Sequence, residues 1–300
     1  MHSSTFSRSH GAFLGLAAVL ALASFTNADA APVPGILPQS GDKVAFLGDS
    51  ITANGNRIPG GYLHLVADGL EKEGVKIEII PAGVSGNTSK DMLARLDKDV
   101  LSKKPQWMTL SCGVNDVWHG VNGVPLDDYK TNITSIVDQA QAAGIKVVIL
   151  TSTMIGEDDN ANNQKLVAYN DFLRSLAAER KLPITDLNAD EHAELAALAQ
   201  EAPIKGNVLT ADGVHPNGLG NEMMAAGILK AFGVPAADVA KLQPDWQKIP
   251  GTCDIVAKST VSAEQLRSLQ KLAAAKNQSV EQYFAAVLDD AIQKQQSAAP

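Results

Sequence analysis

Short apolar runs separated by longer amphipathic segments recur along the chain from residue 43 to residue 232. The segments between the runs repeat apolar residues at helical spacing, mostly over ten residues or more. Strands that alternate with helices in this way form a parallel sheet covered on both faces. We therefore expect a three-layer α/β/α domain. The predicted strands are 44–47, 75–80, 107–112, 145–150 and 184–187, and the predicted helices are 62–70, 88–101, 126–143, 166–182, 193–198 and 219–232.

The pattern changes beyond Pro235. Residues 241–254 show no regular spacing, and two helical patterns follow, each opened by a Ser-x-x-Gln sequence, at Ser262 and at Ser279. A serine followed three residues later by glutamine is typical of a helix N-terminus. We expect 236–300 to be a linker and a C-terminal helical hairpin, and the sequence does not indicate what this extension does.

The N-terminal segment has the features of a secretory signal. Arg8 precedes an apolar run from 11 to 25, and Ala28-Asp29-Ala30 has the small-x-small pattern of a cleavage site. We expect 1–30 to be removed after Ala30, although an uncleaved anchor is the alternative. No later run is apolar and long enough to predict a membrane helix. The main domain then covers 31–235, and we expect a secreted or periplasmic protein.

Charge and cysteine content exclude several classes of partner. The formal net charge of −8 argues against nucleic acid and anionic lipid. Cys112 and Cys253 are the only cysteines, and two thiols are favoured over a disulfide. No cluster of His, Cys and carboxylates has metal-ligand spacing, so we expect neither metal nor cofactor. The sequence does not specify the oligomeric state.

The first predicted strand ends at Gly48-Asp49-Ser50, which places a serine hydroxyl at the carboxyl end of a central strand. Ligands bind at this edge of open α/β sheets, although these residues also form ordinary turns. A serine hydroxyl becomes a nucleophile when a neighbouring base takes its proton. Among the four histidines after residue 30, only His215 combines an acid three residues earlier, Asp212, with a proline directly after it. We expect Ser50 as nucleophile, His215 as base and Asp212 as its orienting partner; the alternative for 212–217 is an ordinary entry into a helix.

Three donors are candidates for holding the negative oxygen that forms during attack on a carbonyl. They are the Ser50 and Gly86 backbone amides and the Asn115 side-chain amide, which follow successive predicted strands. Glycine lets the main chain approach a substrate closely, and an amide donates without adding charge. Taken singly, Gly86 and Asn115 are also typical turn residues.

Four short blocks occur in order, each in a loop after a strand: Gly48-Asp49-Ser50, Ser85-Gly86-Asn87-Thr88, Gly113-Val114-Asn115-Asp116, and Asp212-Gly213-Val214-His215-Pro216-Asn217. This arrangement resembles the SGNH hydrolases, the GDSL lipase/esterase family, over residues 43–232. The resemblance implies a flavodoxin-like sheet of five parallel strands. It also implies the nucleophile, base and acid named above, with Gly86 and Asn115 as oxyanion donors. The Gly-x-Ser-x-Gly elbow of α/β-hydrolases is absent.

These observations predict an exported serine ester hydrolase that acts through an acyl-serine intermediate. Trp118 and His119 directly follow the third block, where an indole suits the face of a sugar, unless Trp118 packs under its own loop. Asp49 is a further candidate for substrate contact. No long apolar lid is evident, so we expect a carbohydrate O-acetylesterase or short-chain carboxylesterase acting on a small-molecule or polysaccharide ester.

Three alternatives stay open at this point. One is a lysophospholipase or thioesterase of the same family, and another is an acyltransferase that uses the same residues. The third, from a different class, is a non-catalytic carbohydrate-binding protein on the same scaffold, which would have no need for a full set of nucleophile, base and oxyanion donors.

Overall fold

The computed structural model describes residues 37–201, 206–249, 253 and 260–298. The chain divides into two compact units, 1–250 and 251–300, and each is described by itself. The predicted signal segment, 1–30, lies outside the described residues.

The first unit is built on a five-stranded parallel sheet, as predicted. The order across the sheet is β2-β1-β3-β4-β5, so β1 and β3 are inner strands. Gly48 at the end of β1 pairs with Gly83 of β2, and Leu47 pairs with Leu110 of β3. The carboxyl ends of neighbouring strands therefore meet at one edge of the sheet. The strands are β1 Lys43–Gly48, β2 Glu78–Gly83, β3 Trp107–Ser111, β4 Lys146–Leu150 and β5 Ile184–Thr185.

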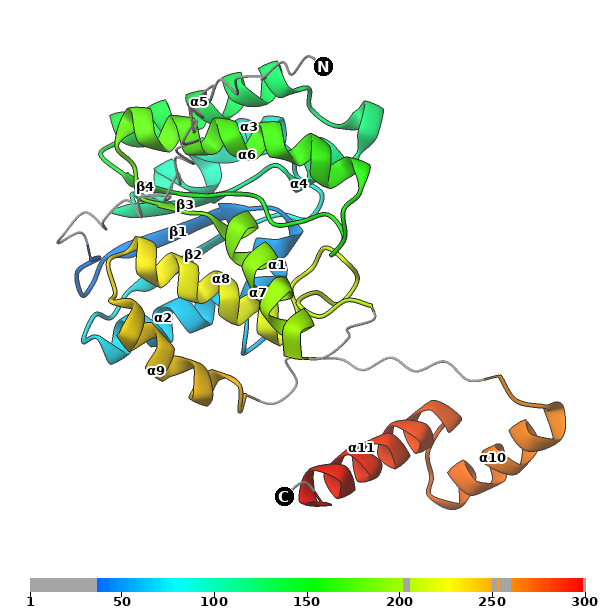
Figure 1. Cartoon of the computed structure of the whole chain (residues 1–300). Coiled ribbons are helices and arrows are strands. Elements are labelled where there is room, and N and C mark those ends of the chain that lie inside the picture. The colour runs from blue at the N-terminus through cyan, green and yellow to red at the C-terminus, as the bar shows by residue number, and fades with distance from the viewer. Residues whose placement is uncertain (1–36, 202–205, 250–252, 254–259, 299–300) are drawn as a thin grey trace, which may run out of the picture. The chain divides into compact units, whose positions relative to one another are not determined.

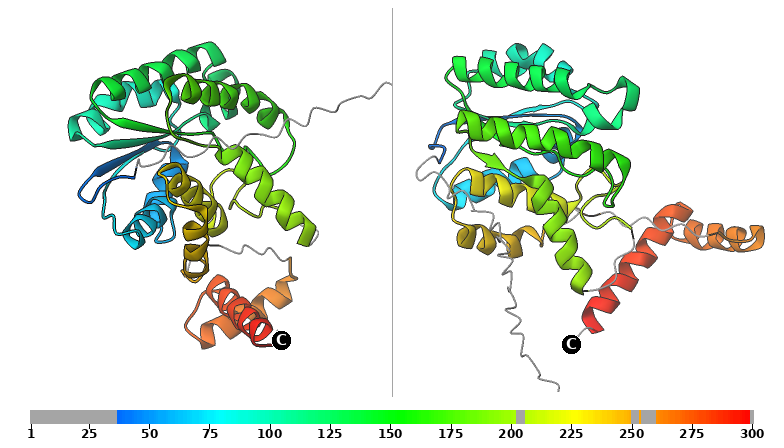
Figure 2. Two further views of the ribbon diagram at one scale, coloured as in Figure 1. Left: turned by 60° about the vertical axis from the view of Figure 1, so that its left-hand side comes forward. Right: turned by 45° about the horizontal axis from the view of Figure 1, so that its top comes forward.

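Helices cover both faces of this sheet, which confirms the three-layer prediction. Figure 1 shows α3, α5 and α6 on one face and α1, α2 and α8 on the other, and the turned views in Figure 2 show the same layers. Residues 44–47 of β1 are completely buried between the layers, as a strand apolar on both sides requires. The helices are α1 Ser50–Arg57, α2 Tyr62–Lys72, α3 Ser89–Asp99, α4 Val114–Trp118, α5 Leu126–Ala142, α6 Ala161–Arg180, α7 Leu187–Glu201 and α8 Gly218–Ala231, with 3-10 turns at Leu101–Lys103 and Gly120–Asn122.

Two boundaries near the first strands differ from the prediction. β2 runs from Glu78 through Pro81 to Gly83, whereas the predicted strand was 75–80. Proline is accommodated there because β2 is an edge strand, and half of the amides of an edge strand do not join the sheet. Ser50 begins α1, a helix absent from the predicted elements, because the Asp49 carboxylate accepts a hydrogen bond from Ile51 N at 2.9 Å and caps it.

The main domain extends further than residue 235, and the prediction of an irregular segment from residue 241 was wrong at its start. Residues Ala236–Trp246 form α9. Pro244 interrupts the helical sequence pattern but lies in the last turn, so most of the helix precedes it. Trp246 is 3% exposed, and its Nε1 donates to Asp68 Oδ2 of α2 at 2.9 Å. The first unit therefore includes α9 and continues to 250.

The second unit contains the two predicted C-terminal helices, α10 Ala263–Ala275 and α11 Val280–Ala298. Both begin with the expected cap. Gln265 N donates to Ser262 Oγ at 3.2 Å while Ser262 N donates to Gln265 Oε1 at 2.8 Å. The corresponding pair at Ser279 has nearly the same distances. The prediction of a C-terminal helical extension is thus confirmed. Within the described parts of the chain, none of the helices combines the length and apolarity needed to cross a bilayer.

We expect Trp246→Ala to lower the free energy of unfolding by about 3–5 kcal/mol, because it removes a large buried side chain and leaves a cavity between α9 and α2. Urea unfolding of the full chain measures this change. Trp118→Ala is the matched control, since that indole is 45% exposed. Equal, small losses for the two variants would contradict the assignment of α9 to the main domain.

α7 brings one buried carboxyl group against the loop that follows β4. Glu191 is 1% exposed and its Oε2 accepts a hydrogen bond from Met154 N at 2.6 Å. Burial raises the pKa of Glu191 from 4.5 to about 7, against the lowering effect of that hydrogen bond. Between these two pH values the folded chain binds more protons at this position than the unfolded chain does.

This raised pKa makes the free energy of unfolding fall as the pH rises from 4.5 to about 7. We expect Glu191→Gln to remove that contribution, so the melting temperature of the variant should gain on the wild type as the pH rises through this window. Thermal unfolding at several pH values measures the difference. Glu194→Gln, on the exposed side of the same helix, is the control. A difference from wild type that does not vary with pH would contradict the raised pKa.

Candidate active site

Ser50 lies where the central strand turns sharply into a helix. β1 ends at Gly48, and Ser50 is the first residue of α1, two positions later. A side chain at position 48 would place its Cβ 2.0 Å from Thr52 Oγ1, so the turn requires glycine. The hydroxyl thus emerges at the carboxyl edge of the sheet, on a helix N-terminus.

The structure brings Ser50, His215 and Asp212 together, although the first two are 165 residues apart. His215 Nε2 is 2.8 Å from Ser50 Oγ, and His215 Nδ1 is 2.7 Å from Asp212 Oδ2. When the aspartate accepts the Nδ1 proton, the lone pair of Nε2 faces the serine hydroxyl. This arrangement can take a proton from Ser50 and hold the resulting positive charge on the ring.

The loop conformation keeps Asp212 ionised. Partial burial works against the negative charge, but its Oδ1 accepts hydrogen bonds from His215 N at 2.9 Å and Val214 N at 3.1 Å, and Oδ2 accepts from the ring. Together these bonds lower the pKa of the Asp212 carboxyl. The acid is therefore charged at neutral pH, as an orienting partner for histidine must be.

Asn115 links the Asp49–Ser50 segment to the loop that contains Gly86. It lies on α4, which follows Gly113. Position 113 requires glycine, because a Cβ there would fall 2.2 Å from Ser152 Oγ. Asn115 Nδ2 donates to Asn87 O at 3.0 Å and to Asp49 Oδ2 at 3.3 Å. Both amide hydrogens are thus engaged, one strongly and one weakly. Gly86 is exposed with φ +79°, a conformation that favours glycine.

Asp49, expected to contact substrate, instead points into the protein. It is 2% exposed, and its two oxygens accept from Ile51 N and from Asn115. Burial raises the pKa of Asp49 to about 6, against the lowering effect of the Ile51 hydrogen bond and of His215. The direct role of this carboxyl group is therefore to cap α1, which begins at Ser50, and to hold the Asn115 side chain.

Trp118 and His119 lie at the end of α4 with their side chains exposed. The indole of Trp118 is 45% exposed, so it is not packed under its own loop. An aromatic ring presented this way has an accessible apolar face.

Arg95 of α3 holds the ends of two strands and the Gly86 loop, and the sequence analysis missed it. Its guanidinium donates to the carbonyls of Gly48 at 2.8 Å and Ala82 at 2.9 Å, and to Asn87 Oδ1 at 2.5 Å. In the sequence, Arg95 and Asp99 have the i, i+4 spacing of an ordinary surface pair, which they also form at 3.0 Å. That pattern gives no signal of the three further contacts.

Asp116 is a second residue whose contacts the sequence did not indicate. It is completely buried, and its carboxylate accepts from Ser89 Oγ at 2.6 Å and Ser89 N at 3.0 Å. Cys112 Sγ lies 3.5 Å from the same carboxylate. These contacts join α4 to the start of α3. They therefore hold together the helix that carries Asn115 and the helix that directly follows the Asn87 loop.

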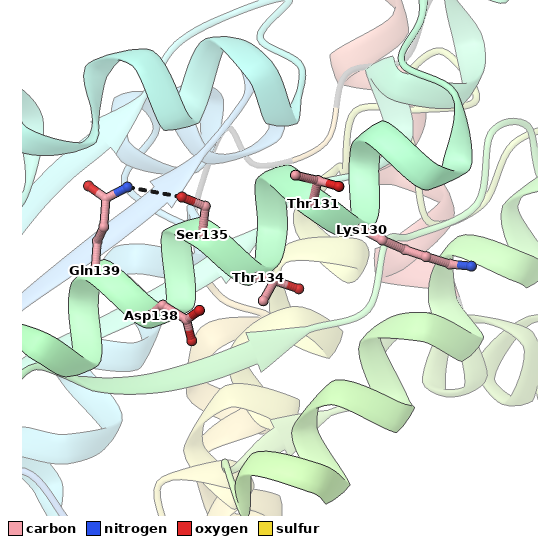
Figure 3. A pocket seen from close by; sticks show the side chains of 6 residues that line it. All are labelled: Lys130, Thr131, Thr134, Ser135, Asp138 and Gln139. Carbon is pink, nitrogen blue, oxygen red and sulfur yellow. Dashed lines mark hydrogen bonds between the residues drawn. The ribbon is translucent and has the colours of Figure 1, made fainter.

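A surface hollow on α5 lacks the groups that a second catalytic site would need. Figure 3 shows its lining side chains, all on successive turns of this one helix, with Ser135 Oγ accepting from Gln139 Nε2 at 3.1 Å. The lining includes no histidine to activate Ser135. No group of three or more His, Cys, Asp or Glu side chains in the described residues is arranged to hold a metal ion.

We expect Arg95→Ala to slow modification of Ser50 by a fluorophosphonate at least tenfold, because small displacements of reacting groups are costly. Intact mass spectrometry follows the modification over time. Lys98→Ala, with an exposed side chain on the same helix, should react at the wild-type rate. Equal rates for the Arg95 and Lys98 variants would show that Arg95 does not hold the site.

Known proteins that resemble this chain include several esterases. The acetylxylan esterase of Geobacillus stearothermophilus is 28% identical over 214 residues, which are 65% of this chain and 95% of that protein. Esterase TesA of Pseudomonas aeruginosa is 27% identical over 171 residues, covering 57% and 77%. The crystal structure of the acetyl xylan esterase AlAXEase matches with a TM-score of 0.59 and 34% identity over 63% of this chain and 98% of that chain.

The model of the GDSL-like lipase/acylhydrolase family matches residues 46–223, more than half of the chain. This range contains all four sequence blocks and the contacts described above. The chain therefore belongs to the GDSL-like lipase/acylhydrolase family and is a serine ester hydrolase of the SGNH type.

Proposed function

We propose that Ser50 Oγ attacks the carbonyl carbon of an ester while His215 Nε2 takes the hydroxyl proton. Collapse of the tetrahedral intermediate breaks the bond to the alcohol, which leaves with the proton returned by His215, and an acyl-serine forms. Water, deprotonated by His215, then attacks the acyl-serine and releases the acid. The observation that carries this proposal is the chain of two short contacts, 2.8 Å and 2.7 Å, from Ser50 through His215 to Asp212.

The negative oxygen of the intermediate is stabilised in this mechanism by Ser50 N–H, Gly86 N–H and the Asn115 amide. The weaker of the two Asn115 hydrogen bonds, to Asp49 at 3.3 Å, supports the role of Asn115. An oxyanion takes over that hydrogen at little cost, while the 3.0 Å bond to Asn87 O keeps the amide in place.

The substrate class that we propose is an O-acetylated carbohydrate, met outside the cytoplasm. Two observations support it. The relatives described above include two acetylxylan esterases that this chain matches over nearly their whole lengths. In addition, the indole of Trp118 is exposed three residues after Asn115, where it can stack on a sugar ring. The N-terminal sequence pattern supports export.

A panel of esters tests this proposal. We expect acetylated xylo-oligosaccharides to be hydrolysed with a higher kcat/KM than aryl acetates, longer acyl esters, lysophospholipids or acyl thioesters. Ser50→Ala should lower kcat on the best substrate by about 10⁴-fold or more, because nucleophile and base act as a unit.

Circular dichroism should give the same spectrum for wild type and variant. Hydrolysis by Ser50→Ala at the wild-type rate would refute the mechanism. Preference for a lipid or thioester substrate would refute the carbohydrate assignment alone. Sugar binding without hydrolysis by the wild type would favour a carbohydrate-binding protein.

A further inference from the structure

Glu157, outside all four sequence blocks, holds the loop that carries the acid and the base. Its Oε1 accepts hydrogen bonds from Leu209 N at 2.9 Å and Thr210 N at 2.7 Å, and its Oε2 accepts from Val208 N at 2.6 Å. The Thr210 hydroxyl also donates to Oε1, at 2.5 Å. Three successive backbone amides and one hydroxyl thus converge on a single carboxylate.

The loop that carries Glu157 is itself held in place by hydrogen bonds. Glu157 lies in the loop between β4 and α6, and several backbone groups of that loop are bound by neighbouring side chains. Met154 N donates to the buried Glu191, and Ile155 N donates to Asn163 Oδ1 at 2.8 Å. Asn160, the cap of α6, donates to Ile155 O at 2.7 Å. Glu157 is therefore supported by α6 and α7.

The contacts continue from Thr210 to the catalytic segment. Thr210 Oγ1 accepts from Gly213 N at 3.0 Å, and the carbonyl of Gly213 accepts from Gly156 N, next to Glu157, at 2.6 Å. Ala211 N donates to His215 O at 2.8 Å and closes the loop. The segment that leads into Asp212, residues 208–210, is thus bound to the β4–α6 loop through Glu157, and Gly213 is bound to the same loop through Gly156.

We propose that Glu157 is a positioning residue for the reaction, which sets the placement of Asp212 and His215 relative to Ser50. This inference rests on the proposed function. A carboxylate suits the position because it offers two acceptor oxygens and a negative charge to donors that all carry partial positive charge. Glutamine has the same size but turns an NH₂ group toward one of those amides, so at least one contact is lost.

The test compares Glu157→Gln with Asp159→Asn in the full chain. Asp159 is an exposed carboxylate two residues away in the same loop, and its side chain accepts a hydrogen bond from Gln164 Nε2 at 3.2 Å. Fluorophosphonate titration counts the reactive Ser50 sites, and hydrolysis of an aryl acetate is then expressed per titrated site. We expect Glu157→Gln to lower kcat per site about 10- to 100-fold with KM nearly unchanged, and to displace the pH profile of kcat/KM. Asp159→Asn should match the wild type.

A purely structural role gives a different result. In that case Glu157→Gln lowers the melting temperature and the number of reactive sites, while kcat per remaining site and the pH profile stay at wild-type values; this outcome overturns the inference. If Glu157→Gln does not fold, Thr210→Val, which removes only the 2.5 Å hydroxyl contact and its link to Gly213, replaces it. A wild-type kcat per site in that variant likewise overturns the inference.

The same measurements separate failure of this inference from failure of the proposed function. If the wild type neither reacts with the fluorophosphonate nor hydrolyses esters, the proposed function fails first. If the wild type does both through Ser50 and the Glu157 variant is equally fast per site, only the positioning role fails.

Discussion

The parallel pairing of β1 with β2 and β3 is the constraint on which the rest of the structure depends. The register that sets Gly48 beside Gly83, and Leu47 beside Leu110, makes three strands end at the same edge of the sheet. The loops that leave this edge carry Ser50, the Gly86 turn and Asn115. Because β1 is buried on both faces, a one-residue shift of its register would exchange Ala45 and Phe46 between two closely packed faces, so the relative placement of these loops is as stable as the core.

Charged side chains then fix what the sheet places only approximately. Arg95 binds the ends of β1 and β2 and the side chain of Asn87. Glu157 binds residues 208–210, the segment that leads to Asp212. Both contact backbone groups through charge-assisted hydrogen bonds, which are stronger than neutral ones. Arg95 lies on α3, and Glu157 lies in the loop after β4. The short contacts of His215 are thus supported by residues that touch no substrate in the proposed mechanism.

Much of the fold was predictable because the signals are local. Apolar runs of strand length, and Ser-x-x-Gln caps such as that at Ser262, depend only on neighbouring residues, and they indicated the sheet and both C-terminal helices. The errors arose where the environment overrides local pattern: Pro81 continues a strand because that strand is at an edge, and α9 continues past Pro244 because Trp246 is buried against α2. Ser50, His215 and Asp212 were selected correctly as neighbours because their residue types and order fit one chemistry. Arg95 and Glu157 escaped notice because their partners are mostly backbone groups distant in sequence, which leave no trace in spacing.

The most direct measurement of the central claim is a crystal structure of the protein after reaction with a fluorophosphonate. The account predicts a phosphorus–oxygen bond to Ser50 Oγ, with the phosphoryl oxygen accepting hydrogen bonds from Ser50 N, Gly86 N and Asn115 Nδ2, and with His215 still bound to Asp212. A phosphoryl oxygen that points away from Gly86 and Asn115, or an adduct on another residue, would contradict it.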